Sequence, residues 1–252
     1  GIDLGGTKIM TAVADENGHI LTKVKLATET ELGQKQIEKN ILASIDKVLD
    51  KVNIKAEEIN SIGIGSPGPL SVKKGIIYES ANLPIENLPI VNLIEKETGV
   101  DTYLQNDANA AALGEKVFGA GKEADNLLFM TISTGVGGGI IINGDIYYGH
   151  TGNAGEIGHT TVDPAGPQCG CGNYGCLESF SSGTAIKNMA EKAIKNSEKT
   201  LLKKLASSNK IDAEMVAKAA SEGDQKALDI FENAGYYLGI GIANLVNIFN
   251  PE

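Results

Sequence analysis

The sequence predicts an α/β protein folded as two lobes. Short apolar strand segments alternate with amphipathic helix segments, which is the pattern of sheets covered by helices. The order of strand, glycine turn and hairpin occurs twice, once at the amino terminus and again after residue 126. At 252 residues the chain is long enough for two lobes with separate cores. We place the boundary near residue 118, which gives lobes at 1–118 and 119–252.

The first lobe is expected to hold a sheet with helices packed on it. Asn17-Gly18 indicates a hairpin turn because both residues tolerate positive φ. Apolar residues recur at helical spacing from Ile37 to Val52, which predicts an amphipathic helix. Asn106 is placed to cap an alanine-rich helix over 108–117. Strands are predicted at 2–4, 8–14, 19–26, 62–64 and 102–104, and a further helix at 93–97.

The second lobe is expected to repeat this opening. Strands are predicted at 127–132, 139–142 and 146–148, and Asn143-Gly144 is a second hairpin signal. Among the helices that follow, two are predicted at 212–222 and 225–249. Because the two openings share only a glycine turn after a strand, the sequence suggests an internal duplication without establishing it.

Composition points to small-molecule partners. The chain has 32 acidic and 22 basic residues and a net charge of -10, with no basic cluster, so neither nucleic acid nor an anionic membrane is an expected partner. No apolar run is long enough to span a bilayer and no secretion signal is visible, so we expect a cytoplasmic protein. Because the chain opens on Gly1 inside a strand and closes just after a long helix, both native ends are expected to lie beyond it.

Two glycine turns are candidates for binding MgATP. In the first, Asp3 would hold Mg²⁺, while Gly5, Gly6, Thr7 and Lys8 would face the phosphates. The alternative is a plain tight turn.

The second turn, Ser133–Gly139, has four glycines in five positions, and Thr134, Gly135 and Gly137 are its candidate phosphate contacts. Glycine at this density has an entropic cost, which favours a ligand against the backbone over a flexible hairpin. Neither turn matches a P-loop or a dinucleotide fingerprint.

Asp107 is the candidate general base. Phosphoryl transfer needs an acceptor for the proton of the attacking hydroxyl, and Asp107 stands where a strand passes into a helix. A helix N-terminus favours the ionised carboxylate. The alternative is that Asn106 and Asp107 only cap and charge-complement the helix.

His159, Cys169, Cys171 and Cys176 form a candidate zinc site. One nitrogen and three thiolates complete a tetrahedral structural Zn²⁺ site, and the crowding of all three cysteines favours a metal over disulfides. His150 is the less convincing alternative to His159. Glu156 and Glu178 flank the ligands, so closing the metal site would bring together two carboxylates able to accept sugar hydroxyls. Their alternative is surface charge.

These motifs resemble the ROK group of bacterial sugar kinases, repressors and open reading frames. The resemblance spans essentially the whole chain and rests on several motifs together. They are Asp3–Lys8, Gly65-Ser66-Pro67-Gly68-Pro69, Ala81-Asn82-Leu83-Pro84, Asn106-Asp107, Thr134–Gly139, Ala154–His159, Cys169–Gly172 and Gly175–Glu178.

The resemblance implies the fold and the roles of individual residues. The fold would be the two-lobed actin/Hsp70/hexokinase-like (ribonuclease H-like) α/β fold, with a cleft between the lobes. Asp107 would be the catalytic base, and His159 would serve both zinc and sugar. The sugar would be held by Asn82, Asn106, Asp107, Glu156, His159 and Glu178.

The resemblance also implies a reaction, the 6-phosphorylation of a hexose by MgATP, with glucose favoured. Fructose, mannose or N-acetylmannosamine are alternative substrates, and a sugar-responsive repressor is the alternative function. Relatives are commonly homodimers or homotetramers. The chain departs from the family where Ile85-Glu86-Asn87 replaces the usual Gly-Trp, and it ends before the strand and glycine loop that contact adenosine.

Overall fold

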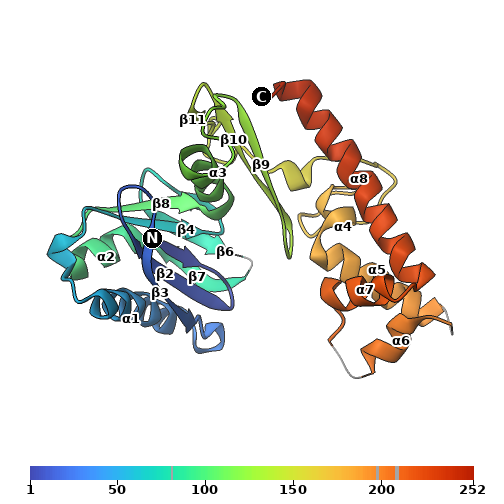
Figure 1. The fold of residues 1–252 in the computed structure, drawn as a ribbon, viewed down its shortest axis with the longest axis horizontal. Helices are drawn as coiled ribbons and strands as arrows, with labels where there is room; N and C mark the ends of the chain where they lie inside the picture. The colour runs from blue at the N-terminus through green and yellow to red at the C-terminus, as the bar shows by residue number, and fades with distance from the viewer. Residues whose placement is uncertain (81, 197–198, 208–209) are drawn as a thin grey trace. The chain divides into compact units, whose positions relative to one another are not determined.

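The protein is described from a computed structural model covering all residues except 81, 197–198 and 208–209 (Figure 1). The chain forms two compact units. The first unit contains Gly1–Ala124 and Ile146–Ala154, and the second contains Asp125–Asp145 and Gly155–Glu252. The first division lies near the boundary expected at residue 118. The segment 146–154 nevertheless belongs to the first unit, although the chain on both sides of it belongs to the second.

The first unit is built on a five-stranded sheet in the order β3-β2-β1-β4-β8. β1 pairs antiparallel with β2 and parallel with β4, which in turn pairs parallel with β8. Since parallel strands point the same way, the carboxyl ends of β1, β4 and β8 lie at one edge. The strands are β1 (Ile2–Leu4), β2 (Lys8–Ala14), β3 (Ile20–Ala27), β4 (Ile62–Ser66) and β8 (Thr102–Asn106).

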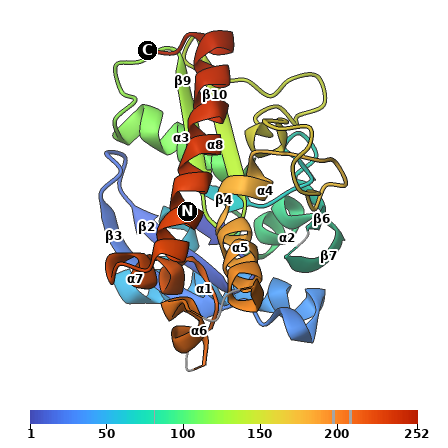
Figure 2. The same ribbon diagram turned by 90° about the vertical axis from the view of Figure 1, so that its right-hand side faces the viewer.

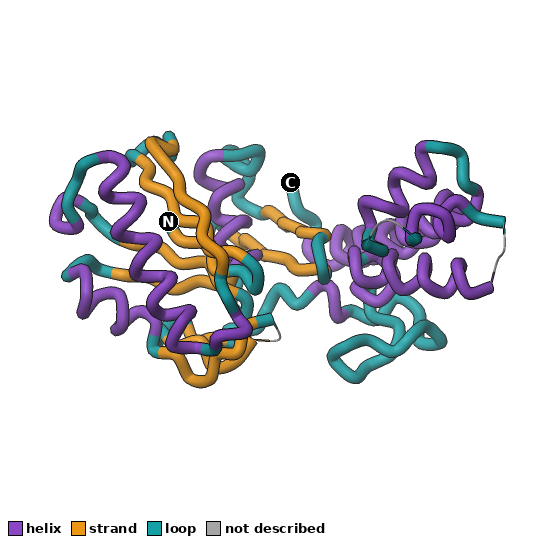
Figure 3. The backbone as a smooth tube through the Cα atoms, turned by 90° about the horizontal axis from the view of Figure 1, so that it is seen from below, coloured by secondary structure: helices purple, strands orange, loops and turns teal. Residues whose placement is uncertain are grey.

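Helices α1 (Gln34–Val52), α2 (Ile90–Thr98) and α3 (Asp107–Phe118) belong to the same unit. The apolar stripe of α1 is buried with the inward side chains of the sheet, as its spacing predicts. α1 packs against β2 and β3, and Figure 3 shows helices of this unit (purple) beside its strands (orange). Short 3-10 turns, η1 (Thr30–Leu32) and η2 (Ala56–Glu58), flank α1.

A second sheet in this unit is absent from the sequence-based expectations. β5 (Leu70–Ser71), β6 (Ile76–Ser80) and β7 (Leu83–Leu88) pair antiparallel in that order. Pro84 lies in β7, which is tolerated because β7 is an edge strand.

The second unit opens on an antiparallel sheet in the order β11-β10-β9. Its strands are β9 (Leu127–Ile132), β10 (Val136–Ile142) and β11 (Asp145–Ile146). β10 begins three residues before the predicted start, because Val136 already pairs with Ile132. The glycine-rich turn is therefore confined to 133–135. Asn143 and Gly144 take positive φ of 53° and 85°, as predicted, whereas in the first hairpin only Gly18 does, at 79°.

A long loop over residues 160–177 and a set of helices follow in the second unit. Figure 2 shows the long α8 running beside α4 and α5. Both boundaries predicted for α8 are confirmed. The helices are η3 (Ile157–His159), α4 (Glu178–Ser181), α5 (Gly183–Asn196), α6 (Leu201–Ala206), α7 (Ala213–Ser221) and α8 (Gln225–Phe249). Among the described residues, no helix combines the length and apolarity needed to cross a membrane.

Asp224 joins two of these helices. It caps α8 by accepting a hydrogen bond from Ala227 N–H at 2.9 Å. Its other oxygen accepts from Leu201 N–H and from the Thr200 hydroxyl, at the start of α6. Burial raises the pKa of Asp224, but these hydrogen bonds outweigh it and the pKa is lowered overall.

We expect Asp224→Ala to lower the free energy of unfolding by about 1–2 kcal/mol, since two helix starts lose their acceptor. Because the folded-state pKa is depressed, this contribution is present above the unfolded pKa of about 4 and disappears as pH falls through the lower folded value. Urea unfolding at several pH values measures both effects. The matched control is Asp229→Ala, which removes an exposed i,i+3 pair with Lys226 at 3.6 Å and an exposed hydrogen bond from Gln225 at 2.8 Å, and is expected to cost about 0.5 kcal/mol. Equal losses in the two variants would contradict the double-cap assignment.

Candidate active site and metal centre

The carboxyl edge of the first sheet brings two aspartates into one neighbourhood. Asp3 on β1 pairs in register with Gly65 on β4, and Gly65 pairs with Gln105 on β8. A Cβ built on Gly65 would lie 3.7 Å from the Asp107 Cα, so a side chain longer than a methyl group would crowd the start of α3. Strand pairing alone therefore places Asp3 and Asp107 near one another.

Asn106 caps α3 as predicted. Its side-chain oxygen accepts hydrogen bonds from Ala108 N–H at 3.0 Å and Asn109 N–H at 3.2 Å. The Asp107 carboxylate accepts from the Ala108 N–H at 2.8 Å. A cap and a candidate base thus occupy consecutive positions, and both side chains accept from the Ala108 N–H at the start of α3.

The pKa of Asp107 is raised above its ordinary value. Although the residue retains exposed surface, the protein atoms gathered around its carboxylate desolvate it, and the negative charge of Asp3 adds to the effect. The hydrogen bond from Ala108 N–H acts in the opposite direction. A carboxylate with a raised pKa is a stronger base than a free aspartate, which suits an acceptor of a hydroxyl proton.

The first glycine turn lies against Asn82. Gly5 N–H donates to the Lys8 carbonyl at 3.0 Å and closes the turn, while Thr7 and Lys8 are exposed beyond it. A Cβ on Gly6 would lie 2.7 Å from the Asn82 carbonyl oxygen, closer than atoms pack, so this approach requires glycine. Ala81, the first residue of the motif that carries Asn82, lies outside the described residues.

Thr28 is a residue of this turn that sequence reasoning missed. It has no accessible surface, and its hydroxyl donates to the Gly5 carbonyl at 2.6 Å. A buried threonine in the first position after a strand gives no pattern that would have singled it out.

The second glycine turn is held by the starts of α4 and α5. Glu178, the first residue of α4, accepts a hydrogen bond from Val136 N–H at 2.9 Å, and a Cβ on Gly135 would collide with the same carboxylate. Gly183 N–H donates to the Ser133 carbonyl at 2.8 Å. The Thr184 hydroxyl donates to the Thr134 carbonyl at 2.7 Å. Thr184 was not predicted as part of the site.

Gly137, predicted as a phosphate contact in a turn, lies inside β10 and pairs with Thr131. Gly138, the next residue of β10, has a packing reason to be glycine. A Cβ on Gly138 would overlap the Ile157 side chain, and one on Gly158 would overlap the Val136 carbonyl. Glycine lets η3 approach the sheet closely, so glycine density in this segment serves packing as well as the turn.

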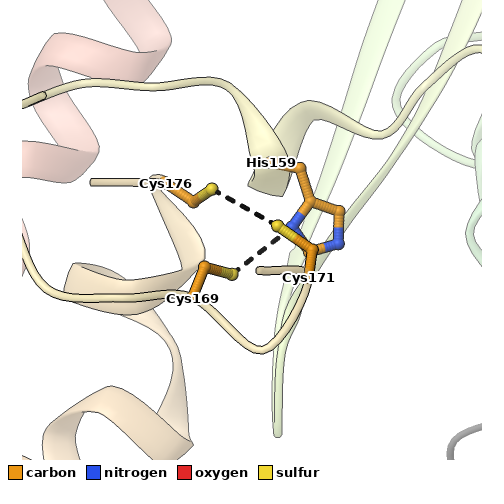
Figure 4. A group of neighbouring side chains, drawn as sticks. All are labelled: His159, Cys169, Cys171 and Cys176. Atoms are coloured by element: carbon orange, nitrogen blue, oxygen red, sulfur yellow. Dashed lines mark hydrogen bonds between the residues drawn. The ribbon is translucent and has the colours of Figure 1, made fainter. Parts of the chain in front are cut away.

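The predicted metal ligands come together in the second unit (Figure 4). One ligand atom from each of His159, Cys169, Cys171 and Cys176 lies within 4.8 Å of all the others. The Cys169 sulfur is 3.6 Å from His159 Nδ1, and the sulfurs of Cys171 and Cys176 are 3.7 Å apart. Of the two candidate histidines, His159 is the one in this group.

This donor set fits zinc. With Zn–S bonds of 2.3 Å and Zn–N bonds near 2.05 Å, a tetrahedron has edges of about 3.8 Å between sulfurs and about 3.6 Å between sulfur and nitrogen. The two distances above match these edges. Burial raises the pKa of Cys169, and it raises that of Cys176 to about 12, so a nearby cation is what would make these thiols thiolates.

The two flanking glutamates lie beside the cluster. Glu156 Oε2 is 4.0 Å from His159 Nε2, the ring nitrogen that faces away from Cys169. Glu178 Oε1 is 3.8 Å from the Cys169 sulfur. Glu156, His159 and Glu178 are therefore grouped in the second unit, while Asp3, Asn82, Asn106 and Asp107 belong to the first.

Comparison with known proteins gives consistent matches. The sequence model described as "ROK family" matches residues 1–252. The glucokinase of Thermotoga maritima is 40% identical over 254 residues, with all of this chain and 78% of that protein covered. The xylose repressor of Bacillus subtilis is 36% identical over 253 residues and is 62% covered. The crystal structure of a ROK family glucokinase from Streptomyces griseus in complex with glucose and AMPPNP matches with a TM-score of 0.82 at 33% identity. The match covers 100% of this chain and 80% of that chain. These likenesses confirm the predicted fold class.

Gly6→Ala is expected to destabilise the first unit by about 1–3 kcal/mol, because the added methyl group must displace the Asn82 backbone. Thermal unfolding measures the loss. Gly63→Ala in β4 is the matched control, since no atom lies within 4 Å of a Cβ at that position. If Gly6→Ala is as stable as Gly63→Ala, the turn does not press against Asn82.

Proposed function

The chain belongs to the ROK family, and from this premise we propose that it is an ATP-dependent kinase acting on the 6-hydroxyl of a hexose, with glucose as the favoured substrate. The observation that carries the proposal is the position and raised pKa of Asp107. This aspartate lies at a capped helix start beside Asp3 and has a raised pKa. That combination suits a proton acceptor better than a helix cap, for which Asn106 suffices.

In the proposed reaction, the protein orients the sugar and accepts one proton. Asn82, Asn106, Glu156, His159 and Glu178 would bind sugar hydroxyls. Asp107 would accept the proton of the 6-hydroxyl as that oxygen attacks the γ-phosphorus of ATP, with ADP as the leaving group.

MgATP would be bound by the two glycine turns. In the first, Asp3 would hold Mg²⁺ through water, and Gly5, Gly6, Thr7 and Lys8 would contact phosphates. In the second, Thr134 and Gly135 would do the same. Gly137, the second residue of β10, is a third proposed phosphate contact beside this turn. Glucose bound with the ATP analogue AMPPNP in the S. griseus glucokinase supports a nucleotide and a hexose as partners.

Zinc would be held by His159 and the three cysteines in a structural role, since four protein ligands leave no open position. Binding through Nδ1 would fix the His159 ring, so that Nε2 faces Glu156 and a sugar hydroxyl. In this proposal the metal-bound loop positions sugar ligands and takes no part in phosphoryl transfer.

A sugar-responsive repressor is the second candidate function. The observation favouring it is the 36% identity to the B. subtilis xylose repressor across this whole chain. Sugar binding without ADP formation would favour it. A kinase acting on mannose, fructose or N-acetylmannosamine would instead be identified by the sugar that supports turnover.

Asp107→Asn is expected to lower kcat by about 10²–10⁴-fold with little change in stability, because the amide cannot accept the proton. Hexose-dependent ADP formation, measured with each of the four sugars, tests this. Asp101→Asn, an exposed aspartate just before β8, is the control and should retain full activity. Since the pKa of Asp107 is raised, the acid limb of kcat/KM should lie above pH 4 and vanish in the variant. Substantial turnover by Asp107→Asn would overturn the assignment of the base.

The purified protein is expected to contain one zinc per chain. Cys171→Ser or treatment with a chelator should remove it, lower the melting temperature and raise the KM for sugar more than the KM for ATP. Metal analysis, thermal unfolding and kinetics give three separate readouts. Tyr174→Phe, an exposed change in the same loop, is the control. Zinc-free protein with unchanged melting temperature and sugar KM would contradict the bracing role.

A further inference from the structure

We propose that Tyr148 is a positioning residue that acts through Gln105 to fix the backbone carrying Asn106 and Asp107. The proposal rests on the proposed function of that pair. Neither Tyr148 nor Gln105 was singled out by its sequence pattern, and both belong to the first unit.

Both ends of the Gln105 amide are engaged. Its oxygen accepts a hydrogen bond from Asn106 N–H at 2.9 Å, and its nitrogen donates to the Tyr148 hydroxyl oxygen at 2.8 Å. Because Asn106 N–H can only donate, the amide oxygen must face it. The amide nitrogen then faces away, toward Tyr148. The hydroxyl thereby holds the glutamine in the orientation that supports Asn106.

Asn109 supplies a competing partner for the Gln105 amide. The Asn109 side chain is 3% exposed, and its oxygen is the one buried side-chain acceptor without a hydrogen bond among the described residues. Its nitrogen donates to the Gln105 oxygen at 3.5 Å, the limit of a hydrogen bond. A buried acceptor without a partner is costly. Without the Tyr148 hydroxyl, the Gln105 and Asn109 amides can turn together so that the Gln105 nitrogen donates to the Asn109 oxygen, which withdraws the Gln105 oxygen from Asn106.

This contact is one link between the segment 146–154 and the rest of the first unit. The Tyr148 hydroxyl reaches across 43 positions of sequence to the residue before Asn106. Within the segment, Ala154 N–H donates to the Tyr148 carbonyl at 3.1 Å. Two residues after Ala154 the chain reaches Glu156, a proposed sugar ligand. One tyrosine thus anchors the segment through its backbone and supports Asn106 through its side chain.

Tyr148→Phe in the full-length protein tests the proposal by deleting only the hydroxyl. Hydrogen exchange at the Asn106 amide is expected to become at least about fivefold faster, because this N–H loses its acceptor. The value of kcat/KM for the sugar should fall about 5- to 30-fold through misplacement of Asn106 and Asp107, with the KM for MgATP unchanged. The melting temperature should change little, since Tyr148 lies at the surface with 37% exposure.

Tyr147→Phe is the matched control, as Tyr147 is the adjacent tyrosine and is 48% exposed. Gln105→Met should reproduce the Tyr148→Phe defect, and the double variant should be no worse than Gln105→Met alone. With Tyr148 intact, Gln105→Glu should keep much of the activity that Gln105→Met loses, since a carboxylate accepts from both Asn106 N–H and the Tyr148 hydroxyl.

Additive effects, or Asn106 exchange equal to that of the Tyr147→Phe control, would overturn the proposal. If the wild-type protein phosphorylates no hexose, the proposed function fails. The exchange experiment, which needs no turnover, still decides whether Tyr148 positions Asn106.

Discussion

The parallel pairing of β1, β4 and β8 is the constraint on which the first half of the site depends. It brings strand ends that are distant in sequence to one edge, and so places Asp3 near Asp107. Gly65 on β4, which lies between β1 and β8, keeps space open at the start of α3. The raised pKa of Asp107 follows from this crowding and from the like charge of Asp3, so the sheet sets the chemistry of the residue that follows it.

The half of the site in the second unit depends instead on the close approach of η3 to β10. Gly138 and Gly158 bring η3 against β10, and Glu178 accepts from the backbone beyond the second turn while lying beside Cys169. The turn, the proposed metal ligands and the carboxylates proposed to bind sugar therefore lie in contact with one another. The meander β9-β10-β11 repeats the order of β1-β2-β3, which supports the duplication that sequence only suggested. β1 has a paired strand on both sides, whereas β9 has one among the described residues.

Sequence reasoning succeeded where a signal is local and periodic. The α1 stripe, the Asn106 cap and the crowded cysteines each follow from short-range rules, and each lies where it was predicted. Sequence reasoning failed where the role of a residue depends on a contact with a residue distant in sequence. Gly138 looked like part of a turn because a local pattern does not show the side chain of Ile157, whose close approach requires glycine at that position.

The β5-β6-β7 sheet was missed for a related reason. Leu83, Ile85 and Leu88 are buried, but Pro84 and the Glu86-Asn87 pair interrupt the apolar alternation on which a strand prediction depends. Thr28 and Thr184 act through single side-chain hydrogen bonds to backbone groups remote in sequence, and Gln105 donates to a tyrosine hydroxyl 43 positions away. Such contacts leave no periodicity, so only the folded chain reveals them.

Kinases and repressors share this body, so overall similarity does not separate the two functions. A protein that only senses a sugar needs ligands for its hydroxyls, which Asn82, Asn106, Glu156, His159 and Glu178 would supply. It gains nothing from a desolvated carboxylate near a second negative charge, an arrangement that disfavours the ionised form. Asp3 lies close enough to Asp107 to help raise its pKa. This unfavourable arrangement has a purpose if Asp3 holds a cation and Asp107 accepts a proton. The electrostatic cost at this edge is therefore the physical reason for favouring catalysis over sensing.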